Sequence, residues 1–242
     1  MSGHSRWAGI KHKKGAIDAK RGKIFTKIVR ELAVAAKTGG GNPENNPRLR
    51  KAMDDAKNAN MPMDNVKKAI ARGTGEIPGV TYEEVTYEGY GPGGAAVFLT
   101  GTTDNRNRTT SEIRKIFSSH GGNLGESGCV AWMFQPKGQI LVEKKAWPDE
   151  EKLMGMAIDA GSEDFQSDEE SYEIITSPAD FEKVRGVLTA AQVPLAAAEQ
   201  TLLPQNYVPL SGSAAEQMLA LMDDLENHDD VKEIYASCDI KE

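Results

Sequence analysis

Residues 139–204 read QILVEKKAWPDEEKLMGMAIDAGSEDFQSDEESYEIITSPADFEKVRGVLTAAQVPLAAAEQTLLP. The run QILVEK predicts a strand, and the amphipathic DEEKLMGMAIDAG that follows predicts a helix. Next, DFQSDEESYEIITS predicts one or two strands, PADFEKVRGVLTAAQ a second helix, and AAAEQTLLP a closing strand. The order β-α-β-β-α-β is that of a ferredoxin-like sandwich. We therefore expect a ferredoxin-like domain over residues 137–204.

The segments on either side of this domain complement each other. Upstream, EEVTYEGY and AAVFLTGTT predict two strands, residues 107–119 a helix, and GCVAWMFQ a buried strand. Downstream, we expect a linker from Pro204 to Gly212, then a helix, SAAEQMLALMDDLENH, and a strand, VKEIYASCD. The upstream part alone lacks a second helix and an edge strand. We therefore predict a discontinuous α/β middle domain, residues 79–136 plus 205–242, with the ferredoxin-like domain inserted in it. The alternative is a linear order of domains.

The first 78 residues have a different character. KIFTKIVRELAVAAK predicts an amphipathic helix that ends at Thr38 and Gly39–Gly41. Asn46-Pro47 opens a second helix, with Asn as N-cap and Pro in the first turn. A third helix is capped by Asp64 and stops at Gly73. We expect residues 1–78 to form a basic arm and a three-helix domain, so the predicted fold class is α+β with three domains.

Charge is distributed unevenly along the chain. Residues 1–80 hold 17 lysine and arginine residues against 7 aspartate and glutamate residues, a balance of +10. Residues 81–242 hold 12 against 29, a balance of -17, which gives the net charge of -7. Such asymmetry points to nucleic acid or an anionic membrane as partner. The alternative is that the charge only keeps both parts soluble.

Composition excludes several classes of protein. At 39% hydrophobic residues the chain can bury real cores, which excludes wholesale disorder. No apolar run approaches the roughly 18 residues of a membrane span, and the first 30 residues lack the apolar region of a secretory signal. Cys129 and Cys238 are too few for a disulfide framework or a four-cysteine zinc site. We therefore expect a cytoplasmic protein without membrane partners.

The basic arm carries most of the predicted binding site. Its lysines and arginines supply phosphate affinity through counterion release, and Trp7 beside Arg6 offers a plane for stacking on an exposed base. The alternative is a solvated tail or a localisation-like basic run. The predicted nucleic-acid-binding residues in the arm and the first helix are His4, Ser5, Arg6, Trp7, Lys11, His12, Lys13, Lys14, Lys20, Arg21, Lys23 and Lys27.

A second basic feature is TDNRNRT, residues 103–109. Arg106 and Arg108 stand near a helix start, where they oppose the positive end of the helix dipole. Together with the amide groups of that helix start, they could hold a phosphate. The equally weighted alternative is that they pair with carboxylates of the acidic body.

Nothing in the sequence assembles an active site. Gly89, Gly91 and Gly94 match the spacing of a dinucleotide-binding loop, but a strand follows them instead of the helix that such a loop requires. We expect a tight hairpin turn with positive φ there. The four histidines have no metal-ligand spacing, and Cys129 is predicted to be an inert thiol in a buried strand. We expect no enzyme activity, metal, cofactor or small-molecule substrate.

Four segments make a resemblance specific: GHSRWAGIKHKKGAIDAKRGKIFTK, YEGYGPGG, TDNRNRT and HGGNLGESGCVAWMF. They resemble the signature segments of the YebC/PmpR family, which includes the mitochondrial translational activator of cytochrome oxidase subunit I. The resemblance covers essentially the whole chain. It implies an N-terminal helical domain and two α/β domains, with the arm from His4 to Lys23 touching nucleic acid.

The resemblance implies two forms of gene regulation. Family members are known as probable DNA-binding transcriptional regulators, whereas similar proteins act at the ribosome and relieve stalls at proline-rich stretches. The third predicted helix offers only Asn65, Lys67, Lys68 and Arg72, and no recognition helix rich in base-reading residues is evident. A glycine-punctuated basic arm suits irregular ribosomal RNA better than an operator groove. DNA and RNA both stay open as the target.

Overall fold

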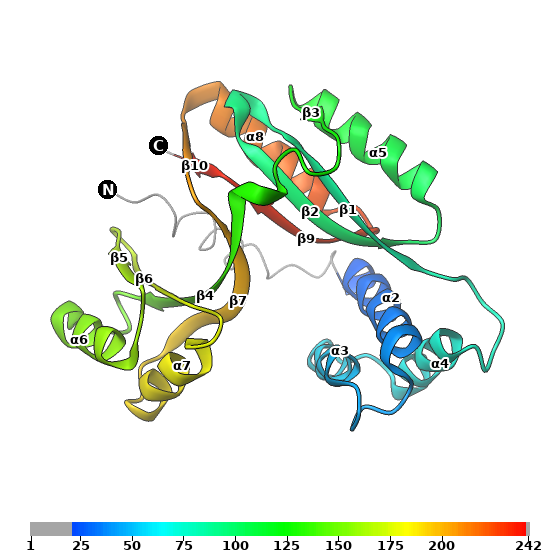
Figure 1. Ribbon diagram of the computed structural model, residues 1–242, viewed down its shortest axis with the longest axis horizontal. Helices are drawn as coiled ribbons and strands as arrows, with labels where there is room; N and C mark the ends of the chain where they lie inside the picture. The colour runs from blue at the N-terminus through cyan, green and yellow to red at the C-terminus, as the bar shows by residue number, and fades with distance from the viewer. Residues whose placement is uncertain (1–20, 241–242) are drawn as a thin grey trace. The chain divides into compact units, whose positions relative to one another are not determined.

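The computed structural model describes residues 21–240, which group into two compact units. The larger unit contains residues 21–130 and 216–234, and the smaller contains residues 131–215 and 235–240 (Figure 1). None of the helices between residues 21 and 240 combines the length and apolar character that crossing a bilayer requires.

The larger unit begins with three helices, α2 (Arg21–Gly39), α3 (Pro47–Asn58) and α4 (Met63–Thr74). Their apolar stripes form one core around Leu32 of α2, Leu49 of α3 and Val66 of α4. Leu32 and Leu49 are fully buried. The predicted three-helix arrangement follows from these stripes because each helix can bury its apolar face only against the other two.

The helix ends follow the local sequence, with one correction. Asn46 is the N-cap of α3, and its side chain accepts the Leu49 N–H at 3.0 Å. Asp64 was expected to cap the third helix, but Pro62 occupies that position and Asp64 lies in the first turn. There its negative charge still interacts favourably with the positive end of the helix dipole, although it forms no capping hydrogen bond. The helix ends at Thr74, one residue beyond the expected Gly73, with Gly75 in the left-handed conformation as C-cap.

A four-stranded sheet in the larger unit has the order β3-β1-β2-β9. Its strands are β1 (Glu83–Tyr90), β2 (Ala96–Thr103), β3 (Asn123–Leu124) and β9 (Val231–Ala236). Helix α5 (Arg106–Ser119) connects β2 to β3, and α8 (Gly212–Glu226) precedes β9. Strand β9 lies beside β2 although about 130 residues separate them, so the C-terminal elements complete this sheet as predicted.

Helices α5 and α8 cover the same face of this sheet. Gly89 and Gly91 are two residues apart at the end of β1, so their side-chain positions point to one face. A Cβ on Gly89 would meet Phe117 of α5 at 2.9 Å, and one on Gly91 would meet Met218 of α8 at 2.7 Å. Glycine at both positions therefore lets the two helices pack closely on the strand.

The turn between β1 and β2 is a short 3-10 helix, Pro92–Gly94. The positive φ expected of this turn is found at Gly93 (68°) and Gly94 (79°). Gly89 lies within β1 instead. Strand β2 follows directly, so no helix start faces the glycines and the dinucleotide-loop geometry is not formed.

The smaller unit contains the ferredoxin-like arrangement. Its elements in chain order are β4 (Phe134–Glu143), α6 (Glu150–Ala160), β5 (Asp164–Ser167), β6 (Ser171–Thr176), α7 (Phe181–Ala190) and β7 (Leu195–Pro204). The sheet order is β5-β6-β4-β7, with all neighbours antiparallel. Buried Ile140, Leu153, Ile174 and Leu188 join both helices and the two central strands in one core.

The largest differences from the sequence prediction lie in two segments. GCVAWMFQ was expected to be a buried strand, but residues 128–130 form a bend and a turn, and Ala131–Met133 form a 3-10 helix. Positive φ at Gly128 (89°) breaks the extended chain there. The expected linker from Pro204 to Gly212 contains strand β8 (Val208–Leu210), which pairs in parallel with β10 (Cys238–Ile240).

The observed architecture is α+β: a helical N-terminal region, a mixed domain whose sheet is completed from the C-terminus, and a ferredoxin-like domain inserted in it. The predicted fold class is therefore confirmed. The domain boundaries at residues 78/79, 136/137 and 204/205 stay a proposal.

Candidate nucleic-acid interface

Most of the predicted arm lies outside the described residues. This applies to His4, Ser5, Arg6, Trp7, Lys11, His12, Lys13, Lys14 and Lys20. Arg21 is the first residue of α2. The other four predicted contact residues, Lys23, Lys27, Arg106 and Arg108, all lie in the larger unit.

Three cations of α2 contact the end of α8 and the turn that follows it. Lys23, Lys27 and Arg30 follow one another at helical spacing, so they share one stripe of α2. Lys23 Nζ donates to the Asn227 carbonyl at 3.0 Å, Lys27 Nζ to the Glu226 carbonyl at 2.8 Å, and Arg30 to the Asp229 carbonyl at 2.6 Å. The last carbonyls of a helix lack partners within it and attract positive charge. The stripe therefore fixes the start of α2, where the predicted arm joins the fold.

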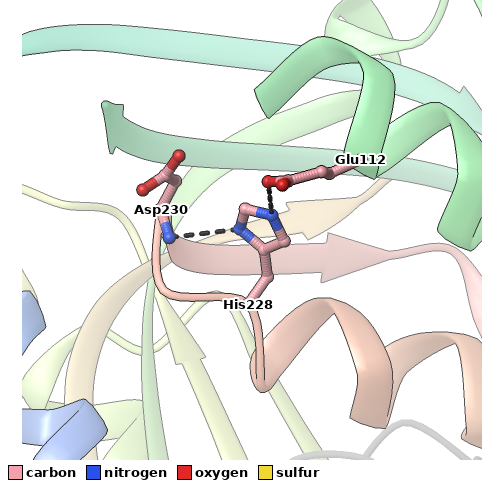
Figure 2. Close-up of side chains that lie close together, drawn as sticks. All are labelled: Glu112, His228 and Asp230. Carbon is pink, nitrogen blue, oxygen red and sulfur yellow. Dashed lines mark hydrogen bonds and ion pairs between the residues drawn. The ribbon is translucent and has the colours of Figure 1, made fainter. Parts of the chain in front are cut away.

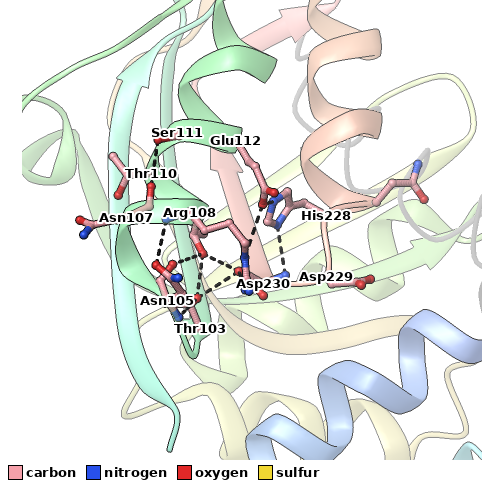
Figure 3. Close-up of polar contacts among 12 residues, drawn as sticks. Thr103, Asn105, Asn107, Arg108, Thr110, Ser111, Glu112, His228, Asp229 and Asp230 are labelled. Carbon is pink, nitrogen blue, oxygen red and sulfur yellow. Dashed lines mark hydrogen bonds and ion pairs between the residues drawn. The ribbon is translucent and has the colours of Figure 1, made fainter. Parts of the chain in front are cut away.

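Asp230, just before β9, is the centre of a buried polar cluster (Figure 3). Its side chain is only 2% exposed. The carboxylate pairs with Arg30 of α2 and, at 3.0 Å, with Arg108 of α5. It also accepts hydrogen bonds from the hydroxyls of Thr103 and Thr109. One carboxylate thus joins α2, β2, α5 and the start of β9.

These contacts keep Asp230 ionised. Burial alone would raise the pKa of Asp230, but hydrogen bonds from Thr109 and Arg108 and the charge of Arg30 outweigh it. The net result is a pKa below the ordinary value of an aspartate. The hydrogen bonds that Arg108 donates to Asp230 and Asp104 raise the pKa of Arg108 further above its ordinary value.

Arg106 and Arg108 pair with carboxylates, which was one of the two alternatives that the sequence left open. Arg108 contacts Asp104 at 2.7 Å besides Asp230, and Asn105 caps α5 by accepting the Arg108 N–H at 3.1 Å. Arg106 lies 3.7 Å from Glu83, with both side chains more than half exposed. Such an exposed pair is weak. A phosphate contact by either arginine stays a prediction.

A groove of about 690 Å³ lies between the start of α2, α5 and the end of α8. Cations and carboxylates are balanced in it, so it does not favour a small anion. Its charged lining residues are Lys23, Arg30, Arg108, Lys115, Glu112, Asp224, Asp229 and Asp230.

Glu112, His228 and Asp230 could be taken for a metal site, because potential ligand atoms of the three lie within 4.8 Å of one another (Figure 2). The hydrogen bonds argue against it. His228 Nδ1 accepts the Asp230 N–H at 3.1 Å, so the ring proton of the neutral imidazole lies on Nε2, 3.0 Å from Glu112. A metal needs an unprotonated ring nitrogen, and the Asp230 oxygens already bind Arg30 and Arg108. We interpret the three residues as a hydrogen-bonded cluster.

Neither cysteine is activated as a nucleophile. Cys129 lies in the half-buried bend before the 3-10 helix, not in the buried strand that the sequence predicted. Desolvation and the nearby charge of Glu88 raise the pKa of its thiol. Burial raises the pKa of Cys238 to about 11. Both thiols are therefore protonated near neutral pH, and the thiolate is the reactive form.

Local sequence patterns did not identify the most connected residues of this region. Arg30 and Asp230 are 200 residues apart, and Glu112 and His228 are 116 apart. No local spacing rule links such pairs. The available signal was the run of two aspartates, Asp229 and Asp230, directly before the predicted strand VKEIYASCD.

Comparison with known proteins places the whole chain. Residues 5–76 match the family model described as TACO1/YebC protein N-terminal domain, and residues 82–238 match the one described as TACO1/YebC second and third domain. A relative from Dictyoglomus turgidum, named probable transcriptional regulatory protein, is 57% identical over 99% of this chain and 96% of its own. One of the same name from Pelotomaculum thermopropionicum is 56% identical over the full length of both chains.

A solved structure agrees with this assignment. The crystal structure of a conserved hypothetical protein from Aquifex aeolicus has a TM-score of 0.80 and 48% sequence identity, over 98% of each chain. The resemblance predicted from the four signature segments is confirmed. The chain belongs to the TACO1/YebC family.

Proposed function

We propose that this protein is a non-enzymatic, nucleic-acid-binding regulator of gene expression, of the DNA-binding transcriptional type, acting in the cytoplasm. The observation that carries the proposal is the separation of charge, +10 over residues 1–80 against -17 over the rest. A cationic segment on an otherwise acidic protein concentrates polyanion affinity at one place and limits it elsewhere. The names of the relatives, probable transcriptional regulatory protein, support a regulatory role.

The thiols and buried carboxylates support the non-enzymatic part of the proposal. The thiols of Cys129 and Cys238 have raised pKa values. The Glu88 carboxylate accepts the N–H groups of Gly128 and Val130, at 2.6 and 2.8 Å. Asp230 is held by two arginines. The two carboxylates therefore hold the fold together, and neither thiol is present as the reactive thiolate.

Neutralising the arm tests the proposal. The triple substitution Lys11→Ala, Lys13→Ala and Lys14→Ala should weaken binding of single-stranded RNA about 50-fold and of duplex DNA about 160-fold at physiological salt, if each lysine contacts one phosphate. The slope of log affinity against log salt should become shallower by about 2 for single-stranded RNA and by about 2.7 for duplex DNA. Fluorescence anisotropy with labelled oligonucleotides from 50 to 300 mM KCl measures both quantities.

The matched control removes three exposed lysines from the smaller unit: Lys145→Ala, Lys152→Ala and Lys183→Ala. It makes the same change in net charge and should leave affinity and slope within about twofold of the wild type. An arm variant that binds like the wild type with an unchanged salt slope refutes the proposal. Preference for duplex DNA over RNA supports the transcriptional form.

A ribosome-associated translation factor, which binds ribosomal RNA and relieves stalling at proline-rich stretches, is the second candidate. The first turn of α4 favours it. In a helix-turn-helix protein the N-terminal residues of the recognition helix read base edges. The first turn of α4 carries instead the acidic Asp64, which repels phosphates.

Ribosome profiling of a deletion strain separates the two candidates. The translation factor predicts at least about a threefold rise in ribosome occupancy at consecutive proline codons, reversed by the wild-type gene. The transcriptional regulator predicts altered transcript levels from particular promoters with unchanged occupancy at proline codons. Co-sedimentation of the protein with ribosomes, lost in the arm variant, supports the first outcome independently.

A further inference from the structure

Helix α5 is an exception in the acidic part of the chain. Its 14 residues carry four basic side chains, Arg106, Arg108, Arg114 and Lys115, and one acidic side chain, Glu112. The other helices after residue 80 are acidic or nearly neutral: α6 has one basic and three acidic residues, α7 has two and one, and α8 has none and four. Local charge alone therefore singles out α5.

The outward face of α5 holds no carboxylate. Thr109, Ile113 and Phe117 are buried and fix the inward face. The residues on the opposite side of the helical wheel are exposed, and they are Asn107, Ser111, Arg114, Lys115 and Ser118. Glu112, the single acid of the helix, contacts His228 beside this face. Surfaces that bind phosphates are typically composed of such polar and basic residues, without acidic ones.

Arg114 and Lys115 differ from the other two cations of the helix. Arg106 and Arg108 contact carboxylates. Within residues 21–240, the side chains of Arg114 and Lys115 form no ion pair and no hydrogen bond, so neither cation is paired with a carboxylate; only their backbone carbonyls accept hydrogen bonds, from Ser118 and Ser119. Ser111 and Ser118 donate their hydroxyls to carbonyls of the preceding helical turn. The two cations are therefore the groups that project from this face.

The position of Lys115 relates this face to the start of α2. Lys115 and Lys23 line the same groove, and Lys23 is the third residue of α2 and the last residue of the predicted arm. The carboxylates in this groove, such as Asp229 and Asp230, disfavour a phosphate inside it. The exposed cations Lys23 and Lys115 favour a polyanion that passes over it.

We infer that the outward face of α5, through Arg114 and Lys115, is a second contact surface for the sugar–phosphate backbone of the nucleic acid that the arm binds. The inference rests on the proposed function and adds two residues, Arg114 and Lys115, that the sequence analysis did not select. The face lacks aromatic side chains for stacking. Its contribution is therefore electrostatic and independent of base sequence.

Removing both cations tests the inference. The variant Arg114→Ala with Lys115→Ala should bind a 30-nucleotide single-stranded RNA about tenfold more weakly at 0.15 M KCl, with a salt slope shallower by about 1.4. The variant with Arg114→Lys and Lys115→Arg keeps both charges and should bind like the wild type. Lys145→Ala with Lys183→Ala makes the same charge change in the smaller unit and should have no effect.

The outcomes separate this inference from the proposed function. Wild-type protein that binds in an arm-dependent way, with an α5 variant of equal affinity and slope, overturns the inference and leaves the function standing. Wild-type protein without polynucleotide affinity overturns both. Because both residues are exposed on a helix, alanine should preserve folding, and circular dichroism checks this. A variant that fails to fold is replaced by Arg114→Gln with Lys115→Gln, for which the same outcomes apply.

Discussion

Replacing Asp230 by alanine should lower the free energy of unfolding by about 4 kcal/mol. The substitution removes a carboxylate whose side chain is 2% exposed, and it leaves Arg30, 13% exposed, without its carboxylate. Breaking a buried ion pair by removing one partner costs about 3–5 kcal/mol, because the remaining charge stays desolvated and uncompensated. Two threonine hydroxyls also lose their acceptor. Urea denaturation followed by far-UV circular dichroism measures the difference.

Two comparisons identify the cause. Asp229→Ala removes the exposed neighbouring carboxylate and should change stability by less than about 0.5 kcal/mol. Combining Asp230→Ala with Arg30→Met removes both charges, so the double variant should be more stable than the sum of the single effects predicts. If the effects of the two substitutions simply add, the pair of Arg30 and Asp230 is not the source of the loss.

The dependence of stability on pH provides a further readout of the same cluster. The pKa of Asp230 is lowered in the folded protein, so the unfolded chain takes up its proton first as the pH falls. The contribution of this group to stability is therefore complete above the pKa of an unfolded aspartate, about 4, and is lost below it towards the lower folded-state pKa. Asp230→Asn cannot titrate, so its stability should fall less steeply than that of the wild type between about pH 4 and pH 2.

Local patterns were sufficient for most of the fold. The apolar stripes of α2 to α4, the N-cap at Asn46 and the alternation in β1 and β2 are each determined within a few residues, and the prediction located them correctly. The insertion followed from counting elements, since the middle domain lacked an edge strand. The predicted buried strand over residues 128–133 was wrong. Its apolar residues suggested burial, whereas Gly128 adopts a positive φ and Trp132 is 65% exposed. A periodicity argument does not detect such a backbone turn.

The candidate site was less predictable because its contacts are not local. Lys23 and Lys27 were identified as cations, but their acceptors are backbone carbonyls about 200 residues away. The sequence does not show which backbone carbonyls lie beside these lysines in the folded protein. Arg108 was identified for opposing the helix dipole, and its compensation by Asp230 depends on β9 lying beside β2. Charge composition predicts the class of partner, while tertiary topology decides which cations remain available to bind it.

The contact between α2 and α4 leads to a second large effect: Gly73→Ala should destabilise the protein by about 3 kcal/mol. Gly73 lies inside α4, where alanine would ordinarily stabilise the helix by about 1 kcal/mol. Here a Cβ would lie 2.2 Å from the Ala33 carbonyl oxygen and 2.9 Å from Ala36 Cβ, both in α2. The helix backbone cannot yield as a flexible side chain can, so the helices must separate, and overpacking of this kind costs about 1–3 kcal/mol, occasionally more.

Two other helical glycines provide matched controls for this substitution. A Cβ on Gly155 of α6 or Gly186 of α7 would meet no atom within 4 Å. Gly155→Ala and Gly186→Ala should therefore each raise the free energy of unfolding by about 0.5–1 kcal/mol, because alanine reduces the entropy of the unfolded chain. The same substitution is thus expected to have opposite signs in α4 and in α6 or α7, as urea denaturation would measure. A stabilising Gly73→Ala would show that α2 and α4 do not approach this closely, and the position of the cationic stripe of α2 would then lose its support.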